Sequence, residues 1–129
     1  MAVDIRRAMP VLKTDDPAQA RRFYEEFLGF RVAMEADGLL MLSSPSVPTT
    51  QMILAWPSTT AMDASLLKLD VSVEVEDVDV AYAEAQAQGQ EIVYPLTDEP
   101  WGIRRFFVRD PAGTTVNVTS HIADLPHRG

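Results

Sequence analysis

The sequence contains no cysteine, which excludes disulfide bonds and thiolate metal sites. His121 and His127 are its only histidines, and it has neither a Gly-x-Ser-x-Gly element nor a glycine-rich phosphate loop. A serine–histidine triad or a phosphate-binding loop is therefore not indicated. No apolar run reaches the about 18 residues of a transmembrane helix, and the first residues lack the apolar stretch of a secretory signal. We expect a cytoplasmic protein.

Positive charge is also scarce. The sequence has eleven Lys and Arg residues and nineteen Asp and Glu residues, which gives a net charge of −8 and a pI near 4.6. This balance argues against nucleic acid or an anionic membrane as a partner. It mildly favours a cationic ligand, although acidity also serves solubility alone. With 47% apolar and 23% charged residues, the 129-residue chain has the composition of one folded domain.

The clearest structural signal is a β-hairpin within residues 101–119. Its turn is predicted at Asp110-Pro-Ala-Gly113, because Pro111 presets φ and Gly113 accepts a positive φ. Val116 and Asn117, in the second arm, are expected on opposite faces of the sheet.

Alternation also divides the first arm of this hairpin. Phe106 and Val108 are expected in the core beneath a helix, whereas Phe107 and Arg105 are expected on the opposite face, where a cleft can form. Trp101 precedes the hairpin. It either walls the cleft, where it can stack on a flat ligand, or plugs the end of the core.

The same order of elements, a strand, a helix and three strands, occurs twice along the chain. Asp16 and Asp77 are predicted helix N-caps, and Gly29 and Gly89 are predicted helix ends, with nearly equal spacing in the two copies. We therefore expect one α+β domain built from two modules. The expected boundaries are module one at about 5–56, a linker at 57–67, module two at about 68–120 and a tail at 121–129.

Within module one, a strand at 9–14 is expected to begin at Pro10 or to lie at a sheet edge, because proline donates no ladder bond. The helix from residue 17 has an apolar stripe of Ala20, Phe23, Tyr24, Phe27 and Leu28. The further predicted elements are strands at 30–36, 39–42, 51–56, 68–75 and 91–96, a helix at 78–88, and a frayed tail at 122–129.

Taken together, these motifs resemble the vicinal oxygen chelate superfamily, which includes glyoxalase I, extradiol dioxygenases and bleomycin-resistance proteins. The resemblance rests on Phe23-Tyr24…Leu28-Gly29-Phe30, Trp101-Gly-x-Arg104 and Asp110-Pro-x-Gly113, and it covers about residues 5–120. It implies paired βαβββ modules whose mixed, curved sheets surround a cleft, often in a homodimer. The modules can pair within one chain or exchange between chains.

The enzymes of this superfamily bind a divalent metal in the cleft. By resemblance, the metal-ligand positions of this chain are Met9, Asp70 and Asn117, where the family's metal enzymes have His or Gln, His or Gln, and Glu. Thioether and neutral amide groups are weak ligands for such ions, and one carboxylate cannot make a site. We therefore expect no metal cofactor.

The resemblance and the missing ligands favour a metal-free binding protein of the bleomycin-resistance type, which sequesters a small aromatic or cationic molecule. Asp70 contacts either this ligand or an internal arginine. A metal-dependent glyoxalase, lyase or dioxygenase with a remodelled site is the alternative, and a structural or regulatory module is a third. The ligand-binding candidates are Trp101, Phe107, Asp70, Glu74, Arg105, Asn117 and Met9, and no catalytic residue is proposed.

Overall fold

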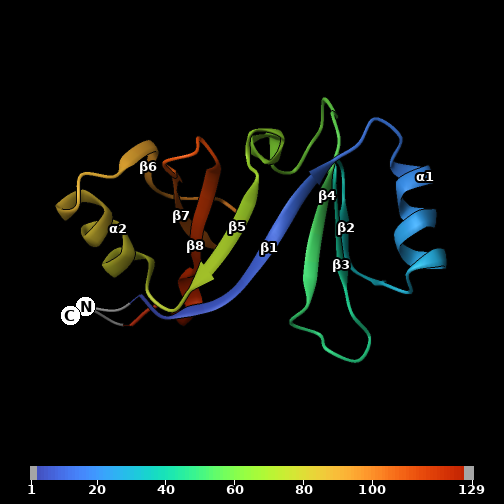
Figure 1. Cartoon of the computed structure of the whole chain (residues 1–129), viewed down its shortest axis with the longest axis horizontal. Helices are drawn as coiled ribbons and strands as arrows, with labels where there is room; N and C mark the ends of the chain where they lie inside the picture. The colour runs from blue at the N-terminus through green and yellow to red at the C-terminus, as the bar shows by residue number, and fades with distance from the viewer. Residues whose placement is uncertain (1–2, 127–129) are drawn as a thin grey trace. The chain divides into compact units, whose positions relative to one another are not determined.

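The computed structural model describes residues 3–126 and divides into two compact units (Figure 1). Residues 9–69 form one, the 9–69 unit. Residues 70–126, together with residues 3–8, form the other, the 70–126 unit. In each unit a helix follows the first strand and packs on the sheet, so the α+β class and the repeated order of elements are confirmed. Within residues 3–126 no helix is long and apolar enough to span a membrane.

The 9–69 unit has the strand order β2-β3-β4-β1. Neighbouring strands in the β2-β3-β4 part are antiparallel, whereas β1 and β4 are parallel, with Val11 opposite Ile53. Its buried core consists of side chains from β3 and β4, including Leu42 and Leu54. The elements are β1 (Ile5–Lys13, of which residues 9–13 belong to this unit), α1 (Pro17–Arg21), η1 (Arg22–Phe27), β2 (Arg31–Ala36), β3 (Leu39–Ser43), β4 (Gln51–Ala55) and η2 (Ala64–Lys68).

The predicted start of the first strand is wrong. Strand β1 begins at Ile5, and Pro10 lies inside it. The register with β4 begins at Val11, directly after Pro10, so this ladder does not need the missing N–H of the proline. Proline is tolerated in a strand at a position where no ladder bond is required.

The first helix also differs from its prediction. Asp16 caps it as expected, by accepting a hydrogen bond from the Gln19 N–H at 3.1 Å. Within the predicted helix, only the first five residues (α1) are α-helical, and the chain continues as the π-helical segment η1. The wider turn breaks the 3.6-residue period on which the predicted stripe depends. Of the stripe, Ala20 and Tyr24 pack on the core, whereas Phe23, Phe27 and Leu28 are 50%, 72% and 52% exposed.

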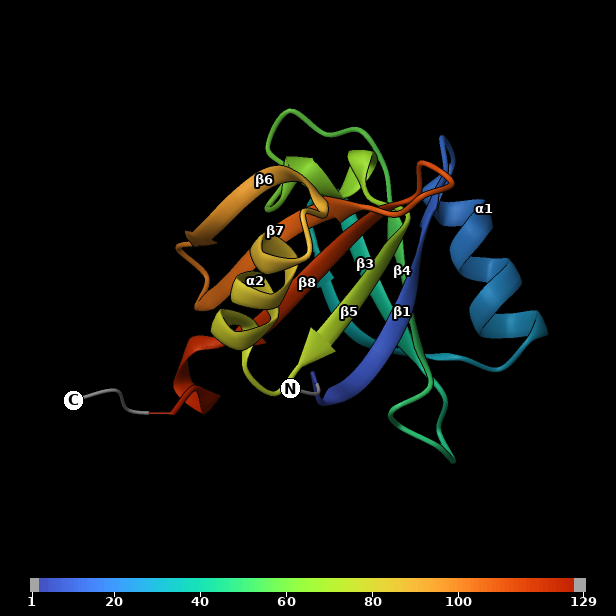
Figure 2. The ribbon, with the colours of Figure 1, turned by 60° about the vertical axis from the view of Figure 1, so that its left-hand side comes forward.

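The 70–126 unit has the strand order β5-β8-β7-β6, in which β5 and β8 are parallel and the other neighbours antiparallel. Figure 2 shows α2 lying across β7 and β8. Helix α2 begins after the predicted cap Asp77, and Gly89 follows its end with a φ of 68°. The elements are β5 (Val71–Val75), α2 (Val78–Ala87), β6 (Glu91–Asp98), β7 (Ile103–Arg109), β8 (Thr115–His121) and η3 (Ile122–Asp124).

Three predicted boundaries in this part of the chain are wrong. Strand β5 begins at Val71 rather than at residue 68, and Lys68 is instead the last residue of the 3-10 helix η2, whose cap Asp63 accepts from the Ser65 N–H. Strand β6 runs two residues further, to Asp98. Residues 122–125 are ordered rather than frayed: η3 is followed by Leu125, which packs against the core. Residues 127–129, including His127, lie outside the described residues.

Candidate functional site

The sheet of the 70–126 unit has two faces of different character. One face is covered by α2, with Phe106 and Val75 buried beneath Val78 and Ala81. This arrangement confirms the prediction that Phe106 and Val108 pack on the helix side. Cross-strand pairing brings together residues of the opposite parity on the other face. These are Ser72 and Glu74 on β5, Asn117 and Thr119 on β8, Arg105 and Phe107 on β7, and Tyr94 on β6.

Arg105 lies at the centre of this second face, and its side chain is only 2% exposed. Its guanidinium carbon is 4.9 Å from the ring centroid of Phe107, 5.2 Å from that of Trp101 and 5.8 Å from that of Tyr94. The Tyr94 and Phe107 rings stack with centroids 4.5 Å apart. We call Tyr94, Trp101 and Phe107 the aromatic box. Because a guanidinium is attracted to ring faces, the box stabilises the buried cation.

Glu99 supplies the negative charge beside Arg105. Its Oε2 atom accepts hydrogen bonds from Arg105 Nε at 2.6 Å and from the Tyr94 hydroxyl at 3.2 Å. Arg105 Nη2 is also 2.6 Å from the same oxygen. The Glu99 side chain is 10% exposed, so the ion pair lies largely away from water, where partners depend strongly on each other.

Asn117 is adjacent to the aromatic box, directly across the ladder from Phe107. Its amide Nδ2 donates to Ser72 Oγ at 3.0 Å. Asn117 is 4% exposed, and its Oδ1 atom is buried without a hydrogen-bond partner. An unpaired buried acceptor lowers the stability of the folded state, and a hydrogen bond from a ligand donor would offset this cost.

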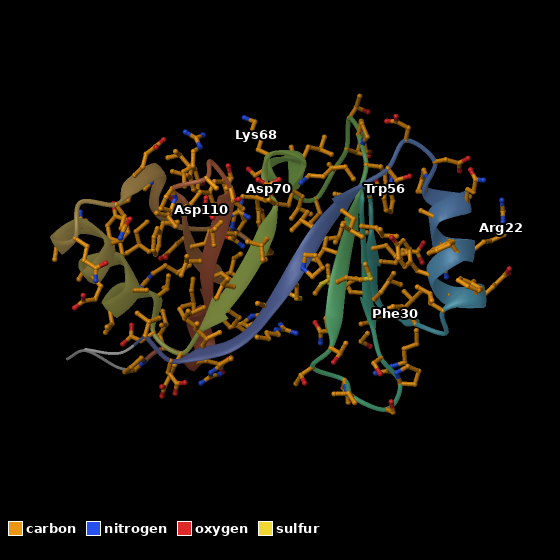
Figure 3. All side chains as sticks on the ribbon, in the orientation of Figure 1. Arg22, Phe30, Trp56, Lys68, Asp70 and Asp110 are labelled. Atoms are coloured by element: carbon orange, nitrogen blue, oxygen red, sulfur yellow. The ribbon has the colours of Figure 1, made fainter. Side chains whose placement is uncertain are left out.

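Of the two acidic candidates, Asp70 immediately precedes β5 and Glu74 lies within it. Asp70 is exposed, and its carboxylate accepts from the Thr115 N–H at 2.9 Å. Figure 3 shows Asp70, which precedes β5, and Asp110, which follows β7, at the same end of the sheet. Glu74 pairs with Arg7, whose Nη2 and Nε atoms lie 2.9 and 3.0 Å from Glu74 Oε2. His121 Nε2 is 3.8 Å from the same oxygen.

The donor set at the positions that the resemblance assigns to metal ligands does not suit a divalent metal. Asn117 offers a neutral amide oxygen, and Asp70 is the one carboxylate in the set. Met9 belongs to the 9–69 unit, where its thioether is 4% exposed. In the part of the chain that the structure describes, no three His, Cys, Asp or Glu side chains gather where they can hold a metal ion.

Residues Glu99 and Tyr94 were absent from the sequence-based candidates. Strand β6, which carries Tyr94, has register shifts on both sides of this residue, so its face cannot be counted from the turn. Glu99 follows the end of β6, in a turn where parity carries no information. The available signal was the Asp98-Glu99-Pro100-Trp101 sequence, which places a carboxylate two residues before the candidate Trp101.

A second charged group lies at the edge of the same unit. Arg104 donates to both oxygens of Asp98, at 2.6 and 3.3 Å, and to Asp79 at the start of α2, at 3.0 and 3.2 Å. The hydrogen bonds between Arg104 and Asp98 lower the pKa of the Asp98 carboxyl and raise the pKa of the Arg104 guanidinium. This cluster joins β6, β7 and α2.

The fold and motifs agree with the comparisons. The family model described as "Glyoxalase/Bleomycin resistance protein/Dioxygenase superfamily" matches residues 6–118. No curated protein matches the sequence. A superfamily member from Vibrio splendidus 12B01 is 17% identical, with a TM-score of 0.67, and the match covers 92% of this chain and 99% of that one. Methylmalonyl-CoA epimerase from Streptomyces coelicolor, in complex with 2-nitronate-propionyl-CoA, is 18% identical, with a TM-score of 0.71 and coverage of 98% and 100%. The chain belongs to the glyoxalase/bleomycin resistance protein/dioxygenase superfamily.

Proposed function

We propose that this protein binds a small, flat organic molecule without a metal ion, on the face of the 70–126 unit that carries the aromatic box. One observation carries the proposal. Asn117 stands where the family's metal enzymes have a glutamate, and its Oδ1 atom is a buried acceptor without a partner. A neutral amide oxygen suits an N–H or O–H donor of an organic ligand better than a divalent cation.

The chemistry around Asn117 supports an aromatic ligand more than a cationic one. The rings of Phe107 and Trp101 already face the Arg105 guanidinium, so a ligand cation would have to displace it. Trp101 is 37% exposed and therefore offers an accessible ring surface for stacking. Glu74, beside Arg7, remains the acidic candidate for a positively charged substituent.

Metal analysis and calorimetry test this proposal. The purified protein should contain no stoichiometric Ni²⁺, Mn²⁺ or Fe²⁺ after soaking and dialysis, and it should bind members of a panel of aromatic compounds that includes bleomycin-like glycopeptides. Asn117→Leu has a similar branched shape but no acceptor, so it should weaken binding about 10-fold or more. Stoichiometric metal that activates turnover would instead establish the metal-dependent enzyme.

We also propose that the chain forms a homodimer. The exposed apolar side chains of Phe23, Phe27 and Leu28 support self-association through the first helix, because monomeric proteins rarely expose such clusters.

A further inference from the structure

Three hydrogen-bond donors converge on one carboxylate oxygen in the 70–126 unit. Arg105 Nε and Nη2 each lie 2.6 Å from Glu99 Oε2, and the Tyr94 hydroxyl lies 3.2 Å from the same atom. Arginine with a neighbouring hydroxyl is a common way to recognise a carboxylate, because both charge and direction are satisfied. The geometry is that of a receptor that already holds a carboxylate.

The surroundings of this receptor are aromatic. The guanidinium lies against Phe107 and Trp101, and Tyr94 stacks on Phe107. Arg105 and Phe107 are on strand β7, which pairs with β6 on one side and with β8 on the other. Tyr94 is on β6. The sheet therefore fixes the backbone positions from which both donor side chains reach the carboxylate.

The carboxylate itself comes from a different kind of segment. Glu99 follows the end of β6 and belongs to the turn that also carries Trp101 and Gly102. Gly102 has a φ of 92°, and its N–H donates to the Glu99 carbonyl at 3.1 Å, which closes the turn. One turn therefore supplies both the anion and the exposed ring that covers Arg105.

We propose that Glu99 is an internal occupant of a carboxylate-binding site, and that the ligand is a molecule with a carboxylate attached to a flat apolar body. The ligand carboxylate replaces that of Glu99 on Arg105 and Tyr94, and the apolar body stacks on the aromatic box. This inference rests on the proposed function, whose ligand class it narrows.

The tethered carboxylate competes with any free one. A group held by a short connection acts at an effective concentration in the range of about 1 mM or more, so the native protein should bind simple carboxylates weakly. Removing the Glu99 carboxylate should therefore tighten the binding of a free carboxylate by about 10-fold or more.

Chemical rescue of Glu99→Ala tests the proposal. We expect this variant to melt at a lower temperature than the native protein, and benzoate to restore most of the loss, acetate part of it, and neutral benzamide or chloride none. Glu91→Ala is the matched control. It removes the exposed partner of Arg109 at the other end of β6, at 60% side-chain exposure, and carboxylates should not rescue it. Equal rescue of both variants, or rescue by benzamide as effective as by benzoate, overturns the proposal.

Glu99→Gln keeps the test decisive if the alanine variant does not fold. In a Trp56→Phe background, Trp101 is the remaining tryptophan, and its fluorescence reports the turn. We expect benzoate to change this fluorescence at concentrations about 10-fold lower in Glu99→Gln than in the native protein. Equal benzoate affinities contradict the proposal. If the compounds that bind in the calorimetric panel bind equally well with and without a carboxylate, this inference alone is overturned. A stoichiometric metal would overturn the proposed function.

Discussion

Phe106 and Trp101 are aromatic residues five positions apart in the same hairpin region, yet they have different surroundings in the structure. Phe106 is 2% exposed, and its ring contacts Tyr82 of α2 with centroids 5.0 Å apart. We predict that Phe106→Ala costs about 3–5 kcal/mol of unfolding free energy, because it leaves a cavity under the helix. Trp101→Ala should cost about 1 kcal/mol, the size of a cation–π contact, while it weakens ligand binding. Urea unfolding measures both costs, and equal costs would make Trp101 a core plug.

At this scale, the sequence predicted which face each hairpin residue occupies but not the partner of Arg105. Strict alternation holds along β7, so Phe106 and Phe107 could be assigned to opposite faces. The partner, Glu99, lies in a turn, where no periodicity relates position to direction. Asp70 was expected to contact a ligand or an internal arginine. The structure shows Glu99 beside Arg105 and Glu91 beside Arg109.

The first helical segment shows the limit of periodicity at the scale of an element. Its cap at Asp16 and its end at Gly29 were predicted correctly, because both depend on local chemistry. Its buried face was predicted incorrectly, because the π-helical stretch η1 changes the number of residues per turn. Figure 3 shows Arg22 of this segment directed away from the sheet.

The exposed residues of this segment give a prediction for the proposed dimer. Phe27 is 72% exposed, so Phe27→Glu should leave the unfolding free energy within about 0.5 kcal/mol of the native value when both proteins are measured at a concentration where the native protein is also monomeric. Because the new charge would be buried in an apolar interface, the variant should be monomeric at concentrations where the native protein is dimeric. Light scattering distinguishes the two states. Glu26→Gln, at the neighbouring exposed position, is the control and should remain dimeric. A native protein that is monomeric throughout contradicts the prediction.

At the scale of the whole molecule, the repeated order of elements was the strongest signal. Two caps and two helix ends with similar spacing indicated two copies of one module, although neither copy has a distinctive motif by itself. The family match to residues 6–118 agrees with the predicted extent of 5–120. The proposed single-domain organisation stays a prediction, because the two compact units are each defined by their own contacts.

The net charge of −8 makes the response to acid a property of the whole chain, with opposing contributions. Protonation of carboxylates lowers their mutual repulsion, but it also removes carboxylates that stabilise the folded state. Asp98 is of the second kind, because hydrogen bonds from Arg104 hold its folded pKa below the ordinary value of 3.8. A lowered folded pKa means that its stabilising contribution is fully present above the unfolded pKa and is lost as the pH falls through the folded pKa.

We therefore predict that Asp98→Asn destabilises the protein at pH 7, and that the difference from the native protein closes as the pH falls below about 4. Urea midpoints at pH 7 and pH 3 measure this difference, at a salt concentration high enough to screen the net charge. Glu26→Gln serves as the control, because it removes one exposed carboxylate without touching the Arg104 cluster. A difference between Asp98→Asn and the native protein that persists unchanged at pH 3 would show that the Arg104–Asp98 contact does not depend on the charge of the carboxylate.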